Sequence, residues 1–236
     1  MKYERPEPFE LISPCISLLD DSPAAGNIRE LEKAGSTFNY QDKQILIRYG
    51  ESVSGLYLIT KGTVSGKILT PQGNEKLVFI MKPFSIFGEA PFYNELESNL
   101  EFEIHSGSVL TFFDKNTVTS LTKENFFFTE LVMKSIMRKA QILTRQLQDI
   151  FYLSPEQRIC KSLLHLCLER GIKSGDEYIL HITQEEIANI VGLSRVTVAR
   201  VYNILKKCNI LNHQDSAKKR LSININNLRH YNTTLD

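Results

Sequence analysis

The chain has 236 residues, of which 42% are hydrophobic, and 28 Lys and Arg stand against 27 Asp and Glu. This length can bury two small cores, and no apolar run approaches the roughly 18 residues that cross a bilayer. The near-neutral balance excludes a protein that binds its partner through a blanket of positive charge.

The first segment, residues 1–19, has the composition of a tail. From Met1 to Pro8 no hydrophobic stretch follows the charged residues, so the pattern of a secretion signal is missing and we expect a cytoplasmic chain with no membrane span. The cysteines lack the paired spacing of a zinc site, which indicates reduced thiols and no metal. They are Cys15, Cys160, Cys167 and Cys208. A redox cross-link through Cys15 or Cys208 stays an open alternative.

Residues 20–120 have the pattern of a small antiparallel β-barrel or roll. Short runs rich in β-branched and aromatic residues are separated by turn signals at residues 49–51, 60–62 and 71–74. The predicted strands cover residues 44–49, 55–60, 63–69, 75–81, 100–105 and 109–113.

Residues 121–153 predict one long helix. Apolar residues recur there at alternating steps of three and four, the heptad pattern of a coiled coil, and Ser154-Pro155 ends the helix after about Tyr152. We call these residues the apolar seam: Met133, Ile136, Ala140, Leu143, Leu147 and Ile150. The seam can pack on the roll or pair with a second copy of the chain.

Residues 154–236 have the pattern of a winged helix-turn-helix. Thr183 and Glu186 have the spacing of a capping box, which predicts a helix that starts near Gln184. Ala188 is small at the point where a second helix must cross closely. Gly192 permits the left-handed backbone that ends the first helix.

Ser194 is a good N-cap for the second helix, the expected recognition helix. Its buried side is predicted to be Val198, Val201, Tyr202 and Leu205. The alternation of Ile210, Leu211, Leu221, Ile223 and Ile225 around a basic turn predicts a two-stranded wing. The residues expected to contact DNA are Thr183, Ser194, Arg195, Val196, Thr197, Arg200, Asn203, Lys218 and Lys219.

An ordinary buried helical hairpin would share some of these features. The coincidence of a capping box, a turn glycine and outward arginines favours DNA binding. From residue 154 onward 12 Lys and Arg stand against 8 Asp and Glu, which predicts a few placed phosphate contacts. A helix-turn-helix binds two half-sites of palindromic double-stranded DNA about one turn apart, so the seam just before it favours a homodimer.

A roll, a long helix and a winged helix-turn-helix in this order resemble the Crp-Fnr family of bacterial transcription regulators. The residues that support the resemblance are Gly50, the run 55–62, the pair Gly88-Glu89 and the segment 182–201. The resemblance implies an α+β fold with a cyclic-nucleotide-binding-like jelly-roll, a dimerisation helix and a winged DNA-binding domain. It also implies an activator that recruits RNA polymerase when an effector binds between the roll and the dimer helix.

One position departs from the family's usual recognition helix. Family members use a glutamate and an arginine to bind a G·C pair, with a second arginine near the helix start. Arg195 and Arg200 match the arginines, but Val196 stands at the glutamate position. Valine can contact a thymine methyl and cannot accept a hydrogen bond from cytosine, so we expect a palindromic, A·T-richer half-site.

Several known effectors of the family are disfavoured. Members that bind cyclic AMP use a glutamate and, about ten residues later, an arginine on the phosphate. Glu89 is present, but no arginine lies between Arg48 and Arg138. Only Cys15 precedes Cys160, which is too few for an iron-sulfur cluster, and His105 is the sole histidine before the helix, which gives no support for haem.

A small organic effector is therefore expected between the roll and the dimer helix. Lys139 either faces the roll, where its ammonium could hold a phenolate or carboxylate, or lies solvated on the helix flank. The expected contacts are Leu77, Phe79, Met81, Ile86, Phe87, Gly88, Glu89 and Lys139.

The stretch 73–79, with Arg138-Lys139 and Arg145-Gln146, is similar to the family branch that regulates organohalide respiration and senses chlorinated phenols. That resemblance implies an aryl acid or halogenated phenol whose oxygen anion is held by Lys139. Phe79 stands where a tyrosine is expected, and Glu89 disfavours an effector that carries a carboxylate.

Two other classes of function share part of this sequence pattern. Small β-barrels include cupin-like metal enzymes, but these need clustered histidine and carboxylate ligands, and this barrel segment has one histidine. A protein-binding adaptor is the second alternative, and salt-sensitive, sequence-specific DNA binding distinguishes it from a regulator. We therefore expect no enzyme activity and no cofactor.

Overall fold

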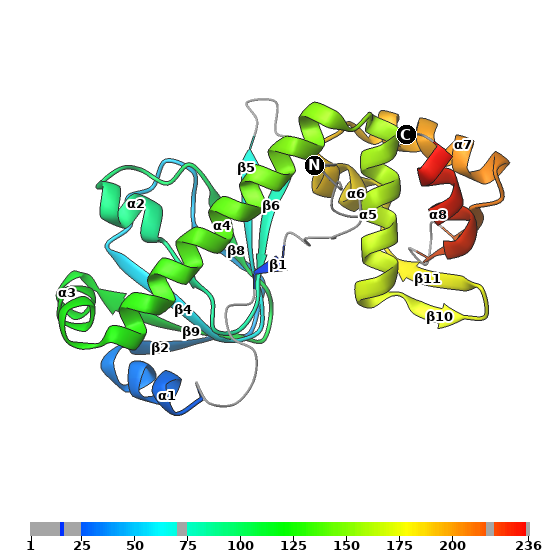
Figure 1. Ribbon diagram of the computed structural model, residues 1–236. Coiled ribbons are helices and arrows are strands. Elements are labelled where there is room, and N and C mark those ends of the chain that lie inside the picture. The colour runs from blue at the N-terminus through cyan, green and yellow to red at the C-terminus, as the bar shows by residue number, and fades with distance from the viewer. Residues whose placement is uncertain (1–14, 17–24, 70–74, 216–219, 235–236) are drawn as a thin grey trace, which may run out of the picture. The chain divides into compact units, whose positions relative to one another are not determined.

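The computed structural model describes residues 15–16, 25–69, 75–215 and 220–234. These residues divide into two compact units, one within residues 14–144 and the other within 145–236. The division falls inside the long helix α4 (Phe126–Tyr152), which appears in green in Figure 1.

The first unit is built on two sheets. One has the strand order β1-β6-β5-β8-β3 and the other β2-β9-β4-β7, and the neighbouring strands are antiparallel except for the β1–β6 pair. The bounds are β1 Cys15–Ile16, β2 Ser36–Tyr40, β3 Gln44–Ile47, β4 Gly55–Lys61, β5 Val64–Leu69, β6 Glu75–Met81, β7 Ile86–Phe87, β8 Glu101–Ile104 and β9 Ser108–Asp114.

Three short helices flank these sheets: α1 (Ala25–Ala34), α2 (Glu89–Asn94) and α3 (Lys115–Glu124). Leu56 and Leu58 of β4 are fully buried and pack with residues of α1, α3 and the first turns of α4 in one apolar core. The ring of Phe113 from β9 meets Phe128 of α4 edge-on, with centroids 5.5 Å apart. The first part of α4 is therefore anchored to the roll by its apolar face.

Among the described residues, α4 buries one face and exposes the opposite one. Leu131, Val132 and Ile142 are buried, whereas the seam side chains are exposed. The exposed fractions are 51% for Met133, 39% for Ile136, 45% for Leu143, 53% for Leu147 and 52% for Ile150, and Ala140 is exposed as well. Packing of the seam on the roll, the alternative left open by the sequence, is therefore wrong.

The second unit contains the last residues of α4, from Arg145 onward, and the chain that follows it. Ser154 caps α5 (Pro155–Arg170) in a capping box with Gln157, and Pro155 occupies the first turn, where its missing N–H costs nothing. A four-stranded antiparallel sheet in the order β10-β11-β13-β12 and three more helices complete the unit. Their bounds are β10 Ile172–Ser174, β11 Glu177–His181, α6 Gln184–Val191, α7 Arg195–Lys207, β12 Leu211–Asp215, β13 Arg220–Asn224 and α8 Ile225–Thr234.

The sheet of the second unit differs from the predicted wing in two respects. The β12–β13 hairpin was predicted, but β10 and β11 were not, and β11 pairs with β13 along its whole length. Placing Ile225 in the wing was wrong, because it is the first residue of α8. The side chain of Asn224 accepts a hydrogen bond from the Asn227 amide at 2.9 Å, and this cap ends the strand and starts the helix.

All six strands predicted for the roll are present, and α4 ends at Tyr152 as predicted. Its predicted start at residue 121 is wrong, because residues 121–124 belong to α3, which ends at its C-cap Asn125, and α4 starts at Phe126. The turn predicted at residues 71–74 lies outside the described residues. Within the described ranges, no helix is long and apolar enough to cross a bilayer.

Candidate DNA interface and effector site

The first helix of the helix-turn-helix, α6, is fixed at its start by the predicted capping box. The Thr183 hydroxyl accepts from the Glu186 amide at 3.1 Å, and the Glu186 carboxylate accepts from the Thr183 amide at 2.7 Å. Two backbone donors that a helix start leaves open are thereby satisfied. Gly192 ends the helix at φ +68, in the left-handed region that glycine adopts without strain.

The recognition helix α7 starts at Arg195, three residues after Gly192. The Ser194 hydroxyl accepts from the Thr197 amide at 3.2 Å, which is the predicted N-cap. The predicted buried side is confirmed, because Val198, Val201, Tyr202 and Leu205 are all at most 2% exposed. Burial of this side leaves the opposite face of α7 to solvent.

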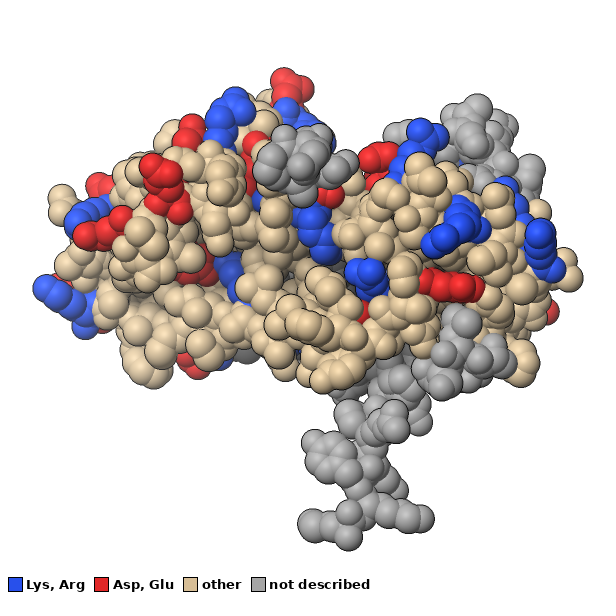
Figure 2. All heavy atoms as spheres, turned by 90° about the horizontal axis from the view of Figure 1, so that it is seen from above, with Lys and Arg blue, Asp and Glu red and all other residues tan. Residues whose placement is uncertain are grey.

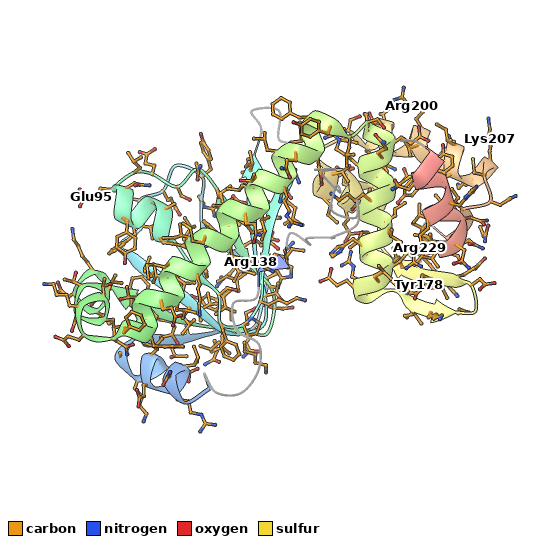
Figure 3. The ribbon with its side chains drawn as sticks, in the orientation of Figure 1. Glu95, Arg138, Tyr178, Arg200, Lys207 and Arg229 are labelled. Atoms are coloured by element: carbon orange, nitrogen blue, oxygen red, sulfur yellow. The ribbon has the colours of Figure 1, made fainter. Side chains whose placement is uncertain are left out.

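The exposed face of α7 includes four of the residues predicted to contact DNA. Arg195, Arg200 and Asn203 are exposed, and Val196 is 79% exposed, although an apolar side chain gains nothing from water. Thr197 is half-buried. Figure 3 shows the side chains of Arg200 and Lys207 extending outward from α7. Lys218 and Lys219 lie outside the described residues.

The wing is tied to β11 by one carboxylate. Glu177 accepts hydrogen bonds from Asn212 of β12 and from Ser222 of β13, and these bonds hold its pKa below the ordinary value. No spacing in the sequence predicts this contact, because the two partners are 35 and 45 residues away from Glu177. In Figure 2 the right-hand part of the molecule shows separate blue side chains, with a few red ones among them, on a largely uncharged surface.

The candidate effector site lies where β7, α2 and α4 meet. Gly88 connects β7 to α2 at φ +94, and a Cβ there would lie 3.2 Å from the Gly55 carbonyl oxygen and 3.3 Å from a methyl of Val53. Both facts require glycine. The turn places Glu89 at the first position of α2, where it is only 4% exposed.

Glu89 has two partners on α4. Its carboxylate accepts from the Ser135 hydroxyl at 2.8 Å and from the Lys139 ammonium. Lys139 also donates to the Ile86 carbonyl oxygen at 2.8 Å. We call Glu89, Ser135, Lys139 and the Ile86 carbonyl the Glu89 cluster. Lys139 thus faces the roll, and the solvated alternative is wrong. Burial lowers the pKa of the Lys139 ammonium, although Glu89 opposes this shift.

The apolar residues predicted for the site are largely core residues of the roll. Phe79, Met81, Ile86 and Phe87 are at most 3% exposed, and Leu77 is half-buried. The ring of Phe87 stacks on Tyr57 at 5.1 Å and on Phe102 at 5.2 Å. Tyr57 and Ser135 were not predicted, and no spacing in the sequence relates either residue to Glu89.

The other potential chemical groups lie apart from this cluster. Among the described residues, no three His, Cys, Asp or Glu side chains gather as metal ligands would. Cys160 and Cys167 are buried, and burial raises the pKa of each thiol to about 12, whereas Cys208 is exposed. The first two are therefore unreactive in the folded protein.

Comparisons with known proteins agree with this architecture. A family model described as "Crp-like helix-turn-helix domain" matches residues 157–230, and one described as "Cyclic nucleotide-binding domain" matches residues 37–125. The "cAMP-activated global transcriptional regulator CRP" of Pasteurella multocida (strain Pm70) is 26% identical over 169 residues, which are 71% of this chain and 81% of that protein.

Two solved structures share the fold at lower identity. The c-di-GMP responsive global regulator CLP of Xanthomonas campestris has a TM-score of 0.74 at 18% identity, covering 84% of this chain and 98% of that one. CprK complexed with OCPA has a TM-score of 0.64 at 22% identity, covering 86% and 92%. The two domain matches, the α6–α7 geometry and the roll with its long helix show that the chain belongs to the Crp-Fnr family of DNA-binding transcription regulators, with an effector-binding domain.

Proposed function

We propose that the chain is a homodimeric activator that binds palindromic DNA and recruits RNA polymerase when a small organic effector, a halogenated phenol or related aryl compound, binds at the Glu89 cluster. This proposal rests on the observation that the chain has two exposed surfaces of different character: the arginine-bearing face of α7 and the apolar seam of α4. The α7 face is suited to bind DNA, and the α4 seam is suited to pack against the same seam of a second copy of the chain.

The seam supports the homodimer. Five large apolar side chains spaced as heptad positions are each between 39% and 53% exposed along one helix. Heptad spacing lets the same face of a second helix interdigitate with it, and a twofold axis along the helices places two identical DNA-binding units about the same axis. A palindromic operator has this symmetry.

The exposed face of α7 supports an A·T-richer half-site. Val196 lies in the first turn of α7 next to Arg195, and Arg200 follows one turn later. An arginine can bond to guanine O6 and N7, whereas valine offers only methyl groups, which match the thymine methyl. Each half-site is therefore expected to contain one A·T pair opposite Val196 beside pairs contacted by arginine.

The Glu89 cluster supports an aryl effector with an acidic hydroxyl. Lys139 is the cation of the cluster, and the rings of Tyr57 and Phe87 lie beside the turn at Gly88. No arginine occurs between Arg48 and Arg138 to hold a cyclic phosphate. A phenol offers a flat apolar ring and one oxygen that Lys139 can bind. Effector contacts to α4 would then favour the DNA-binding arrangement as a population shift.

The direct test is a calorimetric titration with an ortho-chlorophenol. We expect saturable binding by the wild type and its loss in Lys139→Ala. Lys134→Ala is the matched control, because Lys134 lies on the same helix, is 54% exposed and forms an ion pair with Glu130 one turn away. No heat with the wild type, or equal binding by Lys139→Ala, would remove the aryl effector from the proposal.

A further inference from the structure

The Glu89 cluster is balanced in charge, and this balance restricts what can bind to it. Its single carboxylate meets its single ammonium, with side chains 5% and 13% exposed, and the two neutral partners complete their hydrogen bonds. A buried ion of either sign that loses its partner is strongly disfavoured. A ligand that draws Lys139 away from Glu89 therefore exposes the cluster to that penalty.

Among the residues that the structure describes, no second charged group acts on the Lys139 ammonium to take over the charge-balancing role of Glu89. Glu89 is the charged group that acts on the Lys139 ammonium. The other elements packed around the cluster add little charge. β7 consists of Ile86 and Phe87, α4 contributes the Ser135 hydroxyl, and β4 contributes the phenol of Tyr57 next to Phe87. Burial raises the pKa of Tyr57, so it stays protonated and uncharged near neutral pH.

We propose that the cluster accepts its effector only in a net-neutral form, so that an acidic hydroxyl binds together with its proton, which Glu89 takes. The O–H bond of the effector breaks, a new O–H bond forms on a carboxylate oxygen of Glu89, and the effector's oxygen anion pairs with the Lys139 ammonium. No electron is transferred and no co-reactant is needed. This inference rests on the proposed aryl effector and specifies how the site selects for it.

The rule separates effectors by their charge. A phenol carries its own proton into the site, and a phenolate already ionised in water must bind with one proton taken from solvent. A carboxylate that is ionised in water meets the same requirement: unless Glu89 takes one proton from solvent, Glu89 repels the charge of the ligand and no described group of the cluster offsets it. Glu89 is thus the residue that determines specificity for a neutral ligand, although Lys139 makes the contact with the oxygen.

The test measures proton uptake on binding. 2,4,6-Trichlorophenol is titrated calorimetrically near pH 8, where it is ionised in water, in two buffers that differ in ionisation enthalpy. The wild type is expected to take up about one proton per bound molecule, by the linkage of binding to protonation. Glu89→Gln keeps the shape of the side chain but removes its negative charge, so the Lys139 ammonium no longer has a carboxylate partner. It is expected to take up about none and to bind the phenolate about tenfold more tightly.

The absorption spectrum of the bound phenol supplies a second readout. With both proteins saturated, the phenolate band is expected to persist, because the proton resides on Glu89 and not on the ligand. Thermal unfolding of Glu89→Gln checks that the variant is folded. Binding by the wild type without proton uptake, or with the phenolate band lost, overturns this inference alone. If neither protein binds trichlorophenol, the aryl effector is wrong and the inference falls with it.

Discussion

Replacing Val196 by glutamate should exchange the preferred base pair in each half-site from A·T to G·C. Val196 is 79% exposed in the first turn of α7, so a glutamate there displaces no packed neighbour. A negative charge near the N-terminus of a helix is stabilising, so the variant is expected to fold. Glutamate accepts from the cytosine amine, whereas valine cannot.

The size of the exchange follows from one base contact per half-site. A well-placed contact discriminates against the wrong base by about 1–3 kcal/mol, or roughly 5- to 150-fold. A symmetric site has two such contacts, so the ratio for the full palindrome is about the square of that factor, because separated positions add in free energy.

The assay is a competition shift experiment with two palindromes that differ only at the symmetric pair opposite residue 196. Val196→Ala serves as the control, because it removes the methyl contact without adding an acceptor, and it should lose preference without reversing it. An unchanged preference for A·T in folded Val196→Glu would refute the assignment of Val196 to base contact.

Three further outcomes are expected. Thr183→Ala should lower the free energy of unfolding of the second unit by about 1 kcal/mol in chemical denaturation, while Thr183→Ser retains the cap; equal losses would show that the cap is not responsible. Leu143→Lys, at a 45% exposed seam position, should turn the dimer into monomer in sedimentation equilibrium without lowering the unfolding midpoint of the roll, and a persistent dimer would contradict the α4 interface. At pH 8 a thiol reagent should label exposed Cys208 at once, but Cys160 and Cys167, with pKa values of about 12, only after unfolding; rapid labelling of all three would contradict their burial.

The features that the sequence predicted well depend on neighbours along the chain. The capping box of Thr183, the turn at Gly192 and the buried side of α7 each involve contacts within about one helical turn, so spacing alone specifies them. The seam of α4 was predicted as a pattern, and the structure adds that its large apolar side chains are exposed.

The features that were missed depend on distant contacts. Lys139 and Glu89 are 50 residues apart, and no local period indicates that they form a pair. β10 is short and exposed at every residue, and β11 has three half-buried residues in succession, so neither strand shows the alternation that marks a strand with one buried face. Ile225 continues the apolar alternation of β13, but the cap at Asn224 overrides it.

Control of the dimer's binding to palindromic DNA by an aryl effector can be tested directly in one measurement. Purified protein would be used to select sequences from a random DNA pool with and without ortho-chlorophenol, followed by a shift assay on the best site. We predict a palindrome with A·T-rich half-sites that is bound only when the phenol is present. Equal binding without the phenol would contradict the effector, and the absence of any selected palindrome would contradict the dimeric regulator itself.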